Sequence, residues 1–242
     1  GFLLGAIPNP YLLWEKSRTF EVGLDLGFLE NRINANLTYY NRLTTDKYAN
    51  ITIPSTSGVN SVVSNNGKFQ NQGLEFELAF RIIDNKDWKW NISWNGAMNR
   101  NKVIQLPDNG LERNRQGAFQ VYTGNGNEKM WVGGYQEGQT PNDLYAFVAE
   151  GIYRSQDEIP KGLIDITSGG FGSTGRPLYG GAEGYHKLSE SQKKNALPIQ
   201  PGDIKWKDVN GDGVIDNFDR VKIGNTVPKW TGGISTSLSW KS

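Results

Sequence analysis

The sequence predicts an all-β fold, a segment of an antiparallel transmembrane β-barrel with about five long strands joined by alternately short and long connections. Apolar and polar residues alternate over runs of about ten residues, the length with which a tilted strand crosses a bilayer, whereas strands of soluble proteins most often have about five or six residues. Residues that favour strands and turns are abundant, with 8 Trp, 10 Tyr, 10 Phe and 30 Gly among 242 residues.

The first two strands are expected at residues 19–28 and 32–42. Successive side chains of a strand point to opposite faces, so the alternation from Phe20 to Phe28 gives the first strand one apolar and one polar face. The second run alternates in the same way. Residues 29–31 between the two runs predict a tight hairpin.

Three further strands are expected at residues 73–83, 88–99 and 230–240, each with the same alternation. The sequence Asp-Asn-Lys-Asp at 84–87 is dense in turn-forming residues. Three tryptophans lie near strand ends, where membrane barrels carry girdles of aromatic residues. They are Trp88, Trp90 and Trp240.

The lengths of the connections predict a sidedness. Residues 29–31 and 84–87 are short and are expected in the periplasm, whereas residues 43–72 and 100–229 are long and are expected outside the cell. The apolar faces are expected to meet lipid and the polar faces the barrel lumen. The smallest membrane barrels have about eight strands, so we do not expect this chain to close a barrel alone. Gly1 in place of an initiator Met also suggests part of a longer protein.

A soluble protein is the alternative to the barrel. A sandwich with long strands would pack its apolar faces together and turn its polar faces to water, and alternation alone does not separate the two. The corresponding function would be a soluble secreted β-sheet module that binds glycans and has a calcium-braced loop. The length of the runs and the asymmetry of the connections favour the barrel.

The composition argues against several functions. The 26 Lys+Arg and 25 Asp+Glu residues nearly balance, whereas nucleic-acid-binding proteins usually carry a basic surplus. The chain has no cysteine, so it has no thiolate metal site and no cysteine nucleophile. His186 is the single histidine, which leaves little for a catalytic triad or a histidine zinc site. We find no catalytic constellation and expect no enzyme.

An acidic loop from Asp208 to Asp219 (DVNGDGVIDNFD) has the spacing of an EF-hand calcium loop. Calcium prefers oxygen ligands, which such a loop supplies from positions 1, 3, 5, 7, 9 and 12 around a glycine at position 6. The candidate metal ligands are Asp208, Asn210, Asp212, Val214 through its carbonyl, Asp216 and Asp219. The alternative is a turn whose polar side chains bind its own backbone. We expect a structural calcium ion, because the spacing leaves no evident open position for catalysis.

Three ordered blocks of the sequence resemble the SusC-like TonB-dependent transporters of Gram-negative outer membranes. The first, residues 9–46, runs from NPYLLWEKSRTF through the short Asn-Arg turn to a Tyr-Tyr strand that ends in Thr-Thr-Asp. The second, NQGLEFEL at 71–78, is similar to the Asn-x-Gly-x-Glu strand opening of that family. The third, residues 201–241, has its Pro-Gly-Asp, Asn-Gly-Asp-Gly and Pro-Lys elements.

The resemblance implies a function that the residues alone do not specify. It implies part of a 22-stranded barrel, from its C-terminal half, in an outer-membrane importer of glycans or peptides that is energised through TonB. It also implies a plug domain, which we do not find in these residues, and a SusD-like surface lipoprotein as partner. The substrate is not specified by the sequence.

Overall fold

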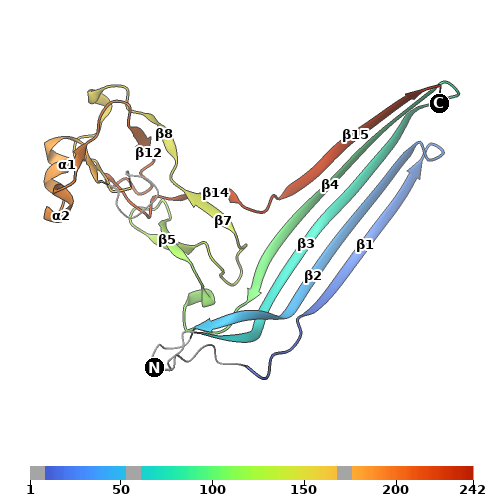
Figure 1. Ribbon diagram of the computed structural model, residues 1–242, viewed down its shortest axis with the longest axis horizontal. Helices are drawn as coiled ribbons and strands as arrows, with labels where there is room; N and C mark the ends of the chain where they lie inside the picture. The colour runs from blue at the N-terminus through green and yellow to red at the C-terminus, as the bar shows by residue number, and fades with distance from the viewer. Residues whose placement is uncertain (1–8, 53–60, 168–175, 242) are drawn as a thin grey trace, which may run out of the picture. The chain divides into compact units, whose positions relative to one another are not determined.

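The computed structural model describes residues 9–52, 61–167 and 176–241. Five long strands form one antiparallel sheet in the order β1-β2-β3-β4-β15 (Figure 1). They are β1 (Lys16–Phe28), β2 (Ile33–Thr52), β3 (Ser61–Asp84), β4 (Trp88–Gln105) and β15 (Trp230–Trp240). The predicted fold class, an all-β chain with five long antiparallel strands, is confirmed.

Three of the strands are longer than the alternation predicts by six residues or more, and β1 begins three residues earlier, at Lys16. β2 ends at Thr52 instead of 42, β3 begins at Ser61 instead of 73, and β4 ends at Gln105 instead of 99. The prediction that residues 43–72 form a connection is therefore wrong for 43–52 and 61–72; residues 53–60 lie outside the described part of the chain. The pairing of β2 with β3 continues through two register shifts near Lys47. Such β-bulges break the strict alternation by which a sequence reveals a strand.

The strand register builds two chemically distinct faces. Residues directly opposite each other on neighbouring strands share a face, so the pairings line up transverse rows across the sheet. One apolar row contains Leu24, Leu37, Phe76, Gly96 and Gly232. The adjacent polar row contains Asp25, Asn36, Glu77, Asn95 and Gly233. The apolar side chains of β1 from Phe20 to Phe28 are 46–63% exposed, so no described element covers this side of β1.

The chain divides into two compact units. The first contains the long sheet and the 3-10 helix η2 (Glu112–Asn114), and the second contains residues 118–133 and 143–224. The first residues of the predicted long connection 100–229 therefore belong to β4, and much of the rest forms the second unit. Residues 168–175 of this connection lie outside the described part of the chain.

The second unit is built from short elements around a small core. Its strands are β5 (Phe119–Tyr122), β6 (Lys129–Val132), β7 (Asp143–Ala146), β8 (Ala149–Ile152), β9 (Ile164–Asp165), β10 (Leu178–Tyr179), β11 (Leu197–Pro198), β12 (Ile204–Trp206), β13 (Val214–Ile215) and β14 (Val221–Asn225). Its helices are η3 (Gln156–Glu158), α1 (Gly181–Lys187) and α2 (Glu190–Lys193). The core contains Tyr153, Ile159, Leu163, Ile199 and Ile215. Among the described residues, no helix is long and apolar enough to cross a membrane.

Candidate functional site

The polar face of the long sheet carries a shallow depression across β2, β3, β4 and β15. Its polar side chains come from rows that the register places next to each other. They are Asn36, Thr38, Glu75, Glu77, Asn95 and Thr231. Alternation along each strand puts these residues on one side, and antiparallel pairing brings them together from segments up to about 200 positions apart.

Amide side chains fix the hydrogen bonding of this face, whereas its carboxylates stay exposed. With its amide group oriented to donate, Asn36 lies 3.2 Å from Asp25 Oδ1. Asn95 Oδ1 accepts a hydrogen bond of 3.0 Å from the backbone N–H of Gly233. Glu75 and Glu77 are exposed and form no ion pair with any described residue. Around the depression the face is thus polar and carries two exposed carboxylates, and a polar surface is what the lumen side of a barrel presents.

Tyr40 and Gly73 form a close contact on the same face. The two residues are paired between β2 and β3. A Cβ atom at Gly73 would lie 2.6 Å from the Tyr40 ring and 2.5 Å from the carbonyl oxygen of Met98. Gly73 therefore lets an aromatic ring lie flat against the sheet, a use of glycine in strands that the sequence pattern alone does not reveal.

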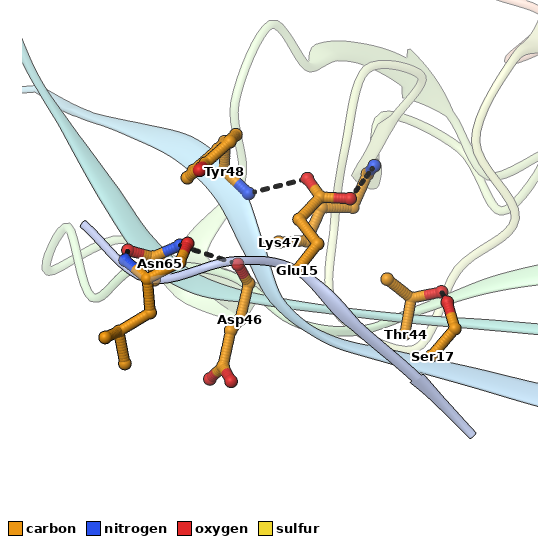
Figure 2. A network of polar contacts seen from close by, with 8 residues as sticks. Glu15, Ser17, Thr44, Asp46, Lys47, Tyr48 and Asn65 are labelled. Carbon is orange, nitrogen blue, oxygen red and sulfur yellow. Dashed lines mark hydrogen bonds and ion pairs between the residues drawn. The ribbon is translucent and has the colours of Figure 1, made fainter.

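A network of polar contacts ties the segment before β1 to the β2–β3 pair (Figure 2). The Asn65 side chain accepts a hydrogen bond from the N–H of Leu13 and donates to its carbonyl oxygen, both at 2.7 Å. It also donates to the carbonyl oxygen of Asp46 at 2.8 Å. Asp46 has a φ of 56°, in the left-handed region, where the strand bulges. The Asn65 side chain thus supplies hydrogen bonds to backbone groups where the bulge interrupts the pairing of β2 with β3.

Glu15 and Ser17 continue this network along the same edge. Glu15 Oε1 accepts a hydrogen bond of 3.1 Å from the N–H of Tyr48, and its other oxygen lies 3.5 Å from Lys47 Nζ. The hydroxyls of Ser17 and Thr44 are 3.1 Å apart. These contacts fix where the chain enters β1 (Figure 2).

The acidic loop lies in the second unit, between β12 and β14, and contains β13. Asp208 accepts hydrogen bonds of 2.8 Å from the N–H groups of Gly211 and Gly213. Asp212 accepts one of 2.8 Å from Val214. Each of these carboxylates therefore stabilises a turn of its own loop, as the turn interpretation of the sequence predicts.

Asp219 is the buried centre of the loop. It is 0% exposed, and its two oxygens accept hydrogen bonds from the N–H groups of Val209 at 2.9 Å and Asp216 at 2.7 Å. Burial raises the pKa of the Asp219 carboxyl, and the two backbone donors offset part of this effect. Asp219 is thus the one loop carboxylate among the described residues that is fully shielded from water.

Two residues that the sequence motif does not include contact this cluster. Tyr122 donates a hydrogen bond of 3.4 Å to Asp216 Oδ2. Burial and the nearby carboxylates, Asp216 first, raise the pKa of Tyr122 to about 12. Lys129 Nζ lies 3.4 Å from the centre of the Phe218 ring and 5.2 Å from that of Tyr122. No sequence signal identifies these partners, because they lie about 90 residues before the motif.

The structure brings all six candidate calcium ligands into one loop, but it arranges them as a self-bonded turn. In the part of the chain that the structure describes, no group of three or more His, Cys, Asp or Glu side chains is placed to hold a metal ion. Calcium binding would require at least Asp208 and Asp212 to share their oxygens between the ion and backbone amides. The calcium site stays a prediction.

Known proteins resemble all or part of this chain. The TonB-dependent receptor P3 of Formosa agariphila is 27% identical over 242 residues, which are 100% of this chain and 21% of that protein. The TonB-dependent receptor SusC of Bacteroides thetaiotaomicron is 36% identical over 99 residues, 40% of this chain and 10% of SusC. The chain therefore spans about a fifth or less of the length of these relatives.

Solved structures show the same fold. The RagAB peptide importer in its closed-closed state matches with a TM-score of 0.57 and 24% identity over 98% of this chain and 21% of that chain. A separate structure of the RagAB peptide transporter matches with a TM-score of 0.56 at 23% identity. The family described as "TonB dependent receptor-like, beta-barrel" matches residues 1–241. The chain therefore belongs to the β-barrel family of TonB-dependent receptors.

Proposed function

We propose that the chain forms part of the barrel wall of an outer-membrane nutrient importer that is energised through TonB. The observation that carries the proposal is the family match over residues 1–241, together with a sheet that has one exposed apolar face and one polar face. A membrane-spanning strand needs both, because lipid tails solvate only the apolar side and a water-filled lumen only the polar side.

In this proposal the chain supplies a passive part of the transporter. The apolar rows of β1–β4 and β15 meet lipid, and the polar rows line the lumen in which transport takes place. A passive wall accords with the names of the relatives, which are receptors. The wall would bound the path that opens when TonB acts on a plug domain.

The second unit, residues 118–133 and 143–224, would form part of the extracellular surface. The proposal assigns it to contact with a SusD-like lipoprotein, and glycans or peptides are the substrate classes. The resemblance of the sequence to SusC-like transporters supports this assignment. A structural calcium ion in the acidic loop would stiffen this unit, since closing a loop with a metal reduces the entropy lost on folding.

Cell fractionation and uptake test the proposal in the full-length protein. We expect the protein in the outer membrane, extractable only with detergent, and we expect growth on a glycan or peptide source to depend on both this protein and TonB. A protein found in the medium or soluble without detergent would favour the alternative of a secreted glycan-binding module. Growth that is independent of TonB would contradict energised import.

A further inference from the structure

Basic residues gather at one end of the apolar face of the long sheet. The last fully apolar row toward the start of β1 contains Val22, Tyr39, Leu74, Met98 and Trp230. The next row contains Phe20, Asn41, Gln72 and Arg100. The row after that contains Arg18, Leu43, Gln70 and Lys102. We call Arg18, Arg100 and Lys102 the basic band.

The register places the basic band on the apolar side of the sheet and not on the lumen side. Directly paired residues share a face, and the two rows are two and four residues beyond the last apolar row on every strand, which keeps them on its side of the sheet. A hydrogen bond between the two rows supports this assignment. Gln70 Nε2 donates to Asn41 Oδ1 at 3.0 Å, so these two side chains, one from each row, lie on the same side of the sheet.

The charges of the band are exposed, and no described acidic residue pairs with them. Arg18, Arg100 and Lys102 are all exposed. None of the three forms an ion pair with a residue that the structure describes, and neither row contains Asp or Glu. The neighbouring Lys16 differs, because Asp46 lies 2.9 Å from it. The band therefore presents uncompensated positive charge next to an uncovered apolar surface.

The spacing of the band suits phosphate groups. Arg100 and Lys102 are two residues apart on one strand, about 7 Å along β4, so one phosphate fits between their head groups. Arg18 lies on β1, three strands away and about 14 Å across the sheet, and reaches a second group. Arginine and lysine are the usual ligands of phosphate, with arginine able to bind two oxygens at once.

We propose that the basic band binds the phosphate groups of a phosphorylated glycolipid in the outer leaflet, whose acyl chains cover the apolar rows next to it. This inference rests on the proposed function, which places the apolar face in the outer membrane, and on the predicted sidedness: the band lies at the end of the sheet away from the short turns 29–31 and 84–87, which are expected in the periplasm. A lipid suits the surface better than a free phosphate ion, because the cations and the exposed apolar rows adjoin on the same face. An acidic partner protein would leave the apolar rows beside the band uncovered.

The test compares two triple variants of the full-length protein purified in detergent. Arg18→Gln with Arg100→Gln and Lys102→Gln removes the band. Arg42→Gln with Arg81→Gln and Lys89→Gln is the matched control, since alternation puts these three cations on the polar face. Retained lipid A is measured by native mass spectrometry and by titration with lipid A before and after enzymatic removal of its phosphates.

We expect wild-type and control proteins to retain phosphorylated lipid A and the band variant to bind it at least about tenfold more weakly. Wild-type protein should also lose this affinity for dephosphorylated lipid A, a result that does not depend on how any variant folds. Equal retention by all three proteins, or equal binding of both lipids by wild type, would overturn the inference. So would a band variant that keeps the lipid but loses an acidic protein partner.

Fractionation separates this inference from the function on which it rests. A full-length protein that sits in the outer membrane and supports TonB-dependent growth, yet binds both lipids equally, would overturn the inference alone. A protein absent from the outer membrane would overturn the proposed function and the inference with it.

Discussion

Arginine substitutions at two neighbouring positions of β1 test which face of the sheet meets lipid. Leu24 is 52% exposed on the apolar face and is paired with Leu37. It lies four residues from each end of the apolar run Phe20–Phe28, about 13 Å along the strand. With the usual strand tilt this is about 10 Å from either end of the run along the membrane normal, which puts Leu24 close to the midplane of an apolar band about 25 Å tall.

Leu24→Arg should therefore destabilise the folded protein by about 2–4 kcal/mol, the cost of an arginine facing lipid near the midplane. Gly23→Arg is the control, because Gly23 faces the other side and a Cβ there would meet only Thr38 Oγ1, at 3.7 Å. The measurement is denaturant unfolding of the full-length protein in lipid vesicles, with heat-modifiable gel mobility to report the folded fraction. Equal tolerance of the two arginines would refute the assignment of the faces.

Four further predictions concern individual contacts. Gly73→Val should destabilise the sheet by about 1–3 kcal/mol, because its Cβ would overlap the Tyr40 ring, whereas unfolding of Gly23→Ala should match wild type. Asn65→Ala removes three hydrogen bonds, so hydrogen exchange at the Leu13 amide should accelerate while exchange in the middle of β1 stays unchanged. Because the pKa of Tyr122 is raised from 10.0 to about 12 in the folded protein, its stabilising contribution is complete below pH 10 and is lost as the pH rises through about 12. The melting temperature of Tyr122→Phe should therefore fall less than that of wild type between these two pH values. Calcium should raise the melting temperature with a Kd on the order of 10⁻⁴–10⁻³ M, and Asp212→Ala should abolish the effect; a titration with no change in wild type would favour the turn.

The sequence predicts the strands that have one apolar and one polar face. Along Phe20–Phe28 each residue meets either the apolar or the polar side, so the pattern has period two and both the strand and its faces can be predicted from it. The polar extension of β2 from 43 to 52 has no such contrast, because both of its faces carry polar residues. Its bulge at Asp46 also shifts the register, so the sequence pattern does not predict its pairing with β3.

The second unit could not be predicted for a different reason. Its strands have two to five residues, too few for a period to show, and their partners are distant in the sequence. Ile164 of β9, for example, pairs with Val214 of β13, 50 positions later. The acidic loop was found because its spacing is local, whereas its contacts with Tyr122 and Lys129 depend on tertiary folding.

In the proposed barrel, β3 would pass from lipid into water along its length. Its 24 residues extend about 80 Å, far more than the roughly ten residues that cross a bilayer. The backbone hydrogen bonds between strands are the same in water and in lipid, so a sheet need not end where the membrane does. What changes along β3 is the outward face, from Leu74, Phe76 and Leu78 to Gln72 and Gln70. Beyond Gln70 the pairing of β2 with β3 no longer has an apolar face that would favour one register. There the side chain of Asn65 connects the bulge of β2 at Asp46 to Leu13, in the segment before β1.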